Sequence, residues 1–114
     1  MKIKLSYIIL ILIGVTAFGA CGTYNKVYKS QDNELKYKAA LAYFEKKDYG
    51  HATPLFEQLI TPFANTKRDD TVNFYQAKGY WGQKDFYNGA YYLDRFCITF
   101  GRSPFVEEAY YLRA

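Results

Sequence analysis

Apolar positions along the chain follow the spacing of α-helices. Leu35, Ala39 and Tyr43 fall on one side of a helix, each about one turn from the last. The pattern breaks at short polar turns and then resumes, so the sequence predicts a series of helices joined by loops. The predicted helices span residues 32–47, 49–63, 69–84 and 86–100, and a fifth begins at Ser103-Pro104.

The predicted helices form a repeat of 37 residues. Lys47-Asp48-Tyr49 recurs 37 positions later as Lys84-Asp85-Phe86. The register continues through the apolar and small positions without a gap, which is typical of a repeat architecture. Matched positions include Tyr37, Phe74 and Tyr111, then Ala40, Ala77 and Ala114, and the pairs Phe44/Trp81, Phe56/Leu93, Leu59/Phe96 and Phe63/Phe100.

Small residues recur on both helices of each predicted pair. An alanine or glycine side chain lets two helices approach closely, so these positions are expected in the contacts between helices. A tyrosine one turn beyond the first-helix alanine is expected to fill the space between repeats. The predicted packing positions are Ala40, Tyr43, Ala52, Ala77, Tyr80 and Gly89.

Turn-forming residues set the expected ends of the helices. Asp48 and Asp85 are expected to cap the second helix of each pair through their short acceptor side chains. Ser103 is the expected cap of the fifth helix, with proline in its first turn. Gly101 suits a left-handed stop after the fourth helix. Pro54 is expected to kink the second helix or to delay its start.

The first 21 residues read as a targeting segment. Two lysines precede an apolar stretch at residues 5–18 that is shorter than the about 20 residues of a membrane-spanning helix. A charged start, a short apolar run and a small-residue exit are typical of a secretory signal. Residues 18–21, Phe-Gly-Ala-Cys, resemble the bacterial lipobox. That resemblance implies cleavage before Cys21 and attachment of diacylglyceryl and acyl (palmitate) lipid to it; the alternative is an uncleaved anchor.

Composition narrows the class of protein. The chain is 50% hydrophobic and 20% aromatic, which excludes a disordered chain, and 114 residues exclude a large multidomain enzyme. Part of the +4 formal charge lies in the signal segment. The sequence has no basic patch that would indicate binding to nucleic acid. With one histidine and two cysteines, a metal site is not expected. If Cys21 carries lipid, Cys97 has no partner in the chain and is predicted to be a small buried hydrophobe.

The repeat resembles the tetratricopeptide repeat. Each unit has a small residue, a tyrosine three positions on, an Asp-aromatic turn, and then Ala or Gly followed by Phe or Leu. The generic unit has about 34 residues, and the extra length falls in the loops between units. The resemblance implies an all-α fold of antiparallel helix pairs stacked in a right-handed solenoid, with two full repeats and the first helix of a third.

Residues 42–60 and 96–111, behind a lipobox, resemble the BamD family of outer membrane assembly lipoproteins in its Bacteroidetes-like form. This resemblance implies an outer-membrane scaffold, anchored by lipid and facing the periplasm. Its partners would be a BamA-like barrel subunit, other assembly-machine components and unfolded outer-membrane proteins. The family has more repeats than are present here, so we expect an N-terminal fragment of a longer protein. The contact with the barrel subunit would lie largely in the later repeats.

These features give an expected domain organisation. Polar residues without apolar periodicity separate the predicted lipid from the repeats, and we interpret them as a flexible tether. The expected segments are 1–20 as signal peptide, 21–32 as lipidated cysteine and tether, and 33–114 as repeats, divided into 33–68, 69–103 and a partial 104–114.

No residue pattern indicates catalysis. His51 is the only histidine, and Asp69-Asp70 reads as a favourable acidic start of a helix. No phosphate-binding loop, metal-ligand spacing or nucleophile motif is found. The chain is therefore expected not to be an enzyme, and to need no cofactor beyond the covalent lipid on Cys21.

A second stripe on the first helices is the candidate binding site. It is offset from the packing stripe, and the corresponding positions of tetratricopeptide proteins line a concave groove. Aromatic rings there could hold an extended peptide or a helix. The alternative is that the same rings belong to the core between repeats. The stripe consists of Tyr37, Leu41, Phe44, Phe74, Lys78, Trp81 and Tyr111.

Two other functions remain open from the sequence. One is a SusD-like carbohydrate-binding lipoprotein that partners a TonB-dependent transporter, a helical-repeat class also rich in aromatics. The repeats here run without the long insertions that form the sugar site of that class, so we favour the assembly scaffold. The other is a generic tetratricopeptide adaptor of the cell envelope.

Overall fold

The structure, a computed structural model, describes residues 22–114. In that range every regular element is a helix, and no strand is present. Residues 32–114 form one compact unit, and the residues before Asp32 belong to another. The predicted signal peptide and Cys21 lie outside the described residues.

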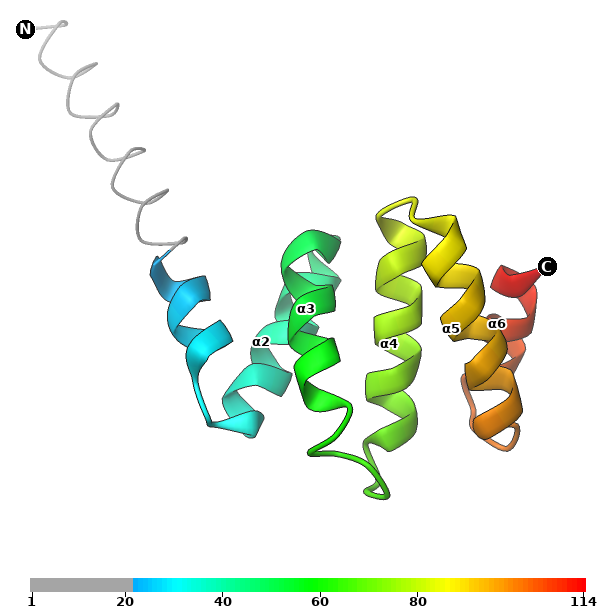
Figure 1. Ribbon diagram of the computed structural model, residues 1–114, viewed down its shortest axis with the longest axis horizontal. Coiled ribbons are helices and arrows are strands. Elements are labelled where there is room, and N and C mark those ends of the chain that lie inside the picture. Colours follow the sequence, from blue (N-terminus) through cyan, green and yellow to red (C-terminus); the bar gives the residue numbers. More distant parts are fainter. Residues whose placement is uncertain (1–21) are drawn as a thin grey trace, which may run out of the picture. The chain divides into compact units, whose positions relative to one another are not determined.

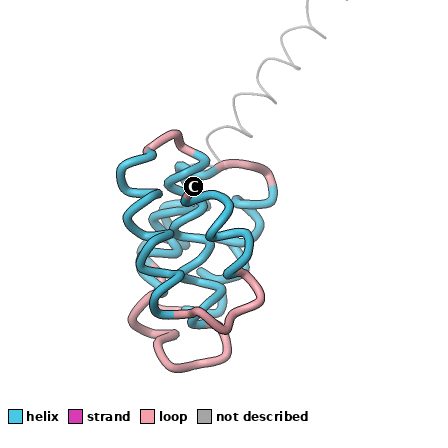
Figure 2. The backbone as a smooth tube through the Cα atoms, turned by 90° about the vertical axis from the view of Figure 1, so that its right-hand side faces the viewer, coloured by secondary structure: helices cyan, strands magenta, loops and turns pink. Residues whose placement is uncertain are grey.

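The compact unit is a stack of helices that alternate in direction (Figure 1). Each helix packs mainly against its neighbours in the chain, and the loops gather along the two edges of the stack where the helices begin and end (Figure 2). This arrangement confirms the predicted all-α fold of two helix pairs followed by the first helix of a third. The helices are α2 (Asn33–Glu45), α3 (Tyr49–Leu59), α4 (Asp69–Gly82), α5 (Phe86–Thr99) and α6 (Val106–Arg113).

The turn inside each helix pair is built around a left-handed lysine. Lys47 has a φ of 62° and its repeat equivalent Lys84 a φ of 64°. The Lys47 N–H donates to Phe44 O, and the Asp48 N–H donates to Tyr43 O, each at 2.9 Å. The same two bonds recur one repeat later. This pattern is the Schellman cap, which more often has glycine at the left-handed position. The repeat therefore preserves backbone geometry as well as apolar pattern.

Two of the three predicted helix caps differ from expectation. Asp85 caps α5 as predicted, because its Oδ1 accepts from the Asn88 N–H at 3.3 Å. Asp48 makes no such bond, since its Oδ2 lies 2.7 Å from Nδ1 of His51 instead. Ser103 does not cap the last helix, which begins at Val106. The Ser103 hydroxyl donates to Asp70 Oδ2 at 2.7 Å, and this bond holds the loop against α4.

Two further expectations are wrong, for Gly101 and for the tether, and one of the two outcomes expected at Pro54 is excluded. None of the described glycines has a positive φ, so Gly101 forms no left-handed stop. The start of α3 is not delayed, because the helix begins at Tyr49 and continues through Pro54. Residues 22–29 are helical, where the sequence analysis expected a tether without regular structure. The periodic residues there are Tyr24, Val27 and Tyr28, whose signal is diluted by the polar neighbours.

The small residues lie inside the stack. Ala40, Ala52, Ala77 and Gly89 are all buried. Gly89 faces the backbone of α4, where an added Cβ would lie 3.1 Å from the backbone nitrogen of Trp81. Ala114 is exposed, and the buried alanine of α6 is Ala109.

The tyrosines beside the small residues pack within their own helix pairs. The Tyr43 ring lies 5.2 Å from that of His51, and the Tyr80 ring stacks on Tyr92 at 5.3 Å between centroids. Other rings fill the space between the two repeats. They are Phe44, Phe56 and Tyr75, with centroid distances of 4.6–6.2 Å.

Candidate functional site

The predicted binding stripe divides into buried and exposed members. Phe74 is 1% exposed. Its ring stacks on Phe105 at 4.8 Å and contacts Phe96 at 5.4 Å. Phe74 is therefore part of the core around α4, α5 and α6, and the expectation that it lines a groove is wrong.

Phe44 joins the two repeats. It is half-buried, and its ring makes edge contacts with Tyr49 at 5.2 Å and Tyr75 at 4.6 Å. Phe56 also contacts it at 6.2 Å and stacks on Tyr75. These contacts favour the alternative that Phe44 belongs to the core between repeats over its predicted place in a groove.

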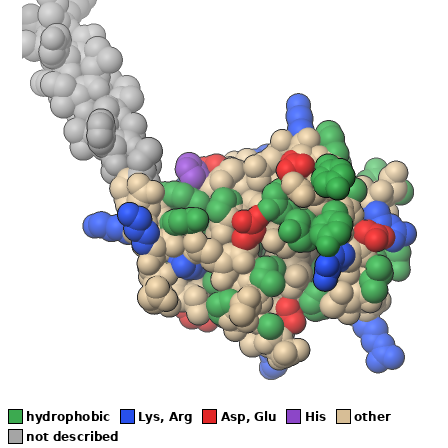
Figure 3. Space-filling view, in the orientation of Figure 1, with side chains coloured by type: hydrophobic (Ala, Val, Ile, Leu, Met, Phe, Trp, Pro, Cys, Tyr) green, Lys and Arg blue, Asp and Glu red, His purple; other side chains and the backbone are tan. Residues whose placement is uncertain are grey.

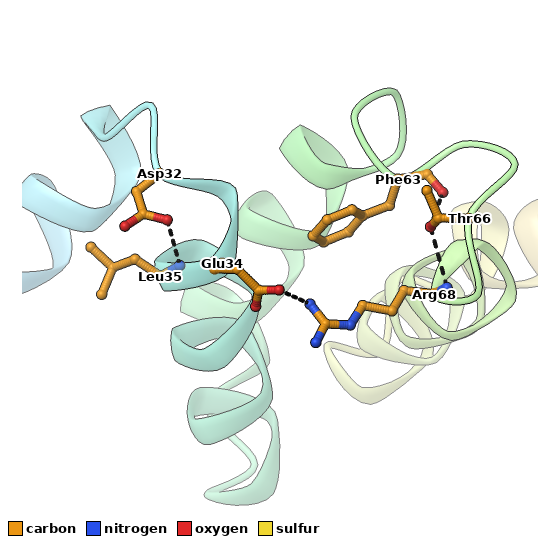
Figure 4. Close-up of polar contacts among 6 residues, drawn as sticks. All are labelled: Asp32, Glu34, Leu35, Phe63, Thr66 and Arg68. Atoms are coloured by element: carbon orange, nitrogen blue, oxygen red, sulfur yellow. Dashed lines mark hydrogen bonds and ion pairs between the residues drawn. The ribbon is translucent and has the colours of Figure 1, made fainter.

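Tyr37 is covered by the loop that follows α3. Its ring meets Phe63 edge-on at 5.6 Å, and the Arg68 guanidinium lies 4.3 Å from the ring centre. Arg68 also donates to Glu34 on α2 at 2.5 Å (Figure 4). Burial by this cover raises the pKa of the Tyr37 hydroxyl, although the nearby guanidinium opposes the shift. The loop thus occupies the face of Tyr37 that a ligand would need.

The rest of the stripe stays at the surface. Trp81 is 39% exposed and Tyr111 81%, while Leu41 is half-buried. Lys78 Nζ forms an ion pair with Glu108 Oε1 at 2.6 Å, which links α4 to α6. We call Leu41, Lys78, Trp81 and Tyr111 the first-helix surface. Figure 3 shows that hydrophobic side chains also reach solvent on the face drawn there, with charged groups between them.

A cleft that the sequence analysis missed lies between α3, α4 and α5. Its volume is about 570 Å³. The signal that could have found it is the spacing of polar residues on α4, where Asp69, Asn73 and Gln76 fall on one side of the helix. We call it the second-helix cleft, lined among others by Glu57, Asn73, Gln76, Tyr92, Arg95 and Phe100.

Residues 22–114 contain no candidate metal site and no candidate membrane-spanning helix. No cluster of three or more His, Cys, Asp and Glu side chains there could hold a metal ion. Among the described helices, none is both long and apolar enough to cross a membrane.

Cys97 is buried, as predicted, and is 4% exposed. Burial raises the pKa of its thiol, with opposing smaller effects of Arg113 and Asp94. The thiolate is the reactive form of cysteine. Because the pKa of the thiol is raised, the folded chain forms this thiolate only at higher pH.

We therefore expect iodoacetamide to modify Cys97 much more slowly in the native protein at pH 7 than in urea. Peptide mapping by mass spectrometry would measure both rates, and equal rates would contradict the buried position.

Comparison of the sequence with known protein families gives a match. The model of a family described as YfiO, outer membrane lipoprotein, matches residues 29–114. The match covers all five helices of the compact unit. Neither the curated proteins nor the solved structures contain a match.

Proposed function

Because the chain belongs to the YfiO family of BamD-like outer membrane lipoproteins, we propose that it is a scaffold of the outer-membrane β-barrel assembly machinery. The family match is the observation that supports this role. The proposal includes a Bacteroidetes-like origin, a cleaved signal peptide and a lipid anchor on Cys21. The scaffold would face the periplasm and bind a BamA-like barrel subunit, other machine components and unfolded outer-membrane proteins.

The first-helix surface is the proposed contact for unfolded outer-membrane proteins. Trp81 and Tyr111 are large rings that lose little conformational entropy on binding, and such residues dominate the energy of protein interfaces. The ion pair of Lys78 with Glu108 fixes a charged group beside them. Phe44 and Phe74 lie close to this surface, with their ring centres 5.8 and 5.7 Å from Lys78 Nζ.

Affinity purification of the full chain from detergent-solubilised envelope tests the scaffold role. We expect a large barrel protein with repeated periplasmic domains to be recovered near one-to-one, as identified by mass spectrometry. Recovery of a TonB-dependent transporter without that barrel protein would reject the assembly scaffold in favour of the carbohydrate-binding alternative.

The surface itself has a separate test. Trp81→Ala combined with Tyr111→Ala should weaken crosslinking of the full chain to peptides of unfolded outer-membrane proteins while leaving helicity unchanged. Tyr87→Ala is the matched control, since Tyr87 is another exposed ring, on α5, outside the first-helix surface. Equal crosslinking by the double variant and the control would exclude the first-helix surface.

A further inference from the structure

Two equivalent contacts between repeats can be compared in this chain. Glu57 on α3 corresponds to Asp94 on α5, and Gln76 on α4 corresponds to Arg113 on α6, each by the shift of 37 residues. In the second contact, Asp94 Oδ1 accepts a hydrogen bond from Arg113 Nη1 at 2.9 Å. A carboxylate at the first of these positions can therefore form an ion pair with a cation at the second.

In the first contact, between α3 and α4, Glu57 and Gln76 form no hydrogen bond with each other. Gln76 is only 6% exposed, yet its side chain makes no hydrogen bond with another described residue. No fully buried side-chain nitrogen or oxygen in residues 22–114 lacks a partner, so the amide of Gln76 reaches the open second-helix cleft. Glu57 lines the same cleft and has no ion-pair partner among the described residues.

The charge at Glu57 is not compensated from within the cleft. Glu57 is exposed at the cleft, and partial loss of solvent raises the pKa of its carboxyl. Arg95 also lines the cleft, where its guanidinium donates to the Tyr91 hydroxyl at 2.9 Å and forms no ion pair with Glu57. The other acidic group, Asp69, already accepts from the side chain of Asn73 at 2.9 Å. The side chains of Glu57 and Gln76 thus line the same cleft without an ion-pair or hydrogen-bond partner among the described residues.

Aromatic side chains form part of the remaining cleft wall. Tyr92, Phe96 and Phe100 line it, and its volume of about 570 Å³ is of the size that takes a few side chains rather than a folded domain. Aromatic faces also attract cations through their negative π surface. The combination suits an extended peptide that carries both a basic and an apolar side chain.

We propose that the second-helix cleft binds a basic segment of a partner protein. A lysine or arginine side chain would enter the cleft and donate to Glu57 and to the Gln76 carbonyl, as Arg113 does to Asp94 in the next repeat. An adjacent apolar side chain would pack on the aromatic wall. This site shares no residue with the first-helix surface and does not depend on the scaffold role.

The test uses the dipeptide acetyl-Arg-Phe-amide as probe, added to the full chain in detergent solution. Nitrogen-15 NMR would follow the side-chain NH₂ signals of Gln76, which are expected to shift. Glu57→Gln should weaken the affinity by about tenfold, since it removes a charge-assisted hydrogen bond. The matched variant Asp94→Asn removes the equivalent carboxylate outside the cleft and should leave the affinity unchanged. Acetyl-Glu-Phe-amide is the probe of opposite charge and should not shift these signals.

A second variant separates loss of the site from loss of folding. Gln76→Arg should create beside Glu57 the ion pair that the next repeat already contains. We expect this variant to melt no lower than the wild type and yet to lose binding of the basic probe. The proposal is overturned if the Gln76 signals do not move, if the acidic probe moves them equally, or if Glu57→Gln binds as the wild type does.

Discussion

Phe74→Ala is expected to lower the free energy of unfolding by about 3–5 kcal/mol, because it removes a fully buried ring and leaves a cavity. Phe74 contacts Phe96 and Phe105, so its loss opens the core shared by α4, α5 and the start of α6. A domain of this size has a total stability on the order of 5–15 kcal/mol. A large part of the chain would therefore unfold under mild denaturant.

Trp81→Ala is the control for this prediction. Trp81 lies on the same helix but is partly exposed, and its ring makes an edge contact with Phe86 at 6.1 Å. Its removal should cost about 1 kcal/mol or less. Urea titration followed by circular dichroism measures both values. If the two variants were equally stable, Phe74 would not be a core residue and its place in the binding stripe would have to be reconsidered.

Gly79→Ala should cost about 1–3 kcal/mol, although alanine is the better helix former. Gly79 on α4 faces Thr53 on α3, and an added Cβ would overlap the threonine hydroxyl oxygen. Thr53 is buried and accepts from Gln83 Nε2 at 3.0 Å, so its side chain has little room to turn away. The contact between the two repeats would have to open.

A double-mutant cycle tests whether this overlap is the cause. Adding Thr53→Ala to Gly79→Ala removes the overlapping atom and should recover much of the lost stability, a non-additive result expected of residues in contact. Gly50→Ala is the matched control, since nothing lies near the position of its Cβ, and it should be neutral or stabilising. Strict additivity of the Gly79 and Thr53 changes would argue against the contact.

The repeat explains why the fold could be predicted from the sequence. Helices, turns and small packing residues are local features, and the shift of 37 residues shows them twice. Even the left-handed turns at Lys47 and Lys84 obey the shift, although lysine gives no sign of a positive φ. The pattern fixes which residues share a helix face, and that is sufficient to define the stack.

The site was harder to predict because loops decide which face stays open. Periodicity places Phe74 and Tyr37 on the predicted stripe, but Phe105 and Arg68 from the loops cover them. Such contacts depend on where a loop crosses the stack, and no spacing in the sequence encodes this. The second-helix cleft requires three helices to be placed together, so its residues appear unrelated along the chain.

The pairing of each helix mainly with its neighbours in the chain also has a consequence for how the protein comes apart. The strongest helix contacts all join neighbours in the chain, so the stability of the compact unit is largely a sum of terms between adjacent helices. α4 is held by both α3 and α5 and also carries the ion pair of Lys78 with Glu108 on α6. Amide protons near the middle of α4 should therefore be among the last to exchange.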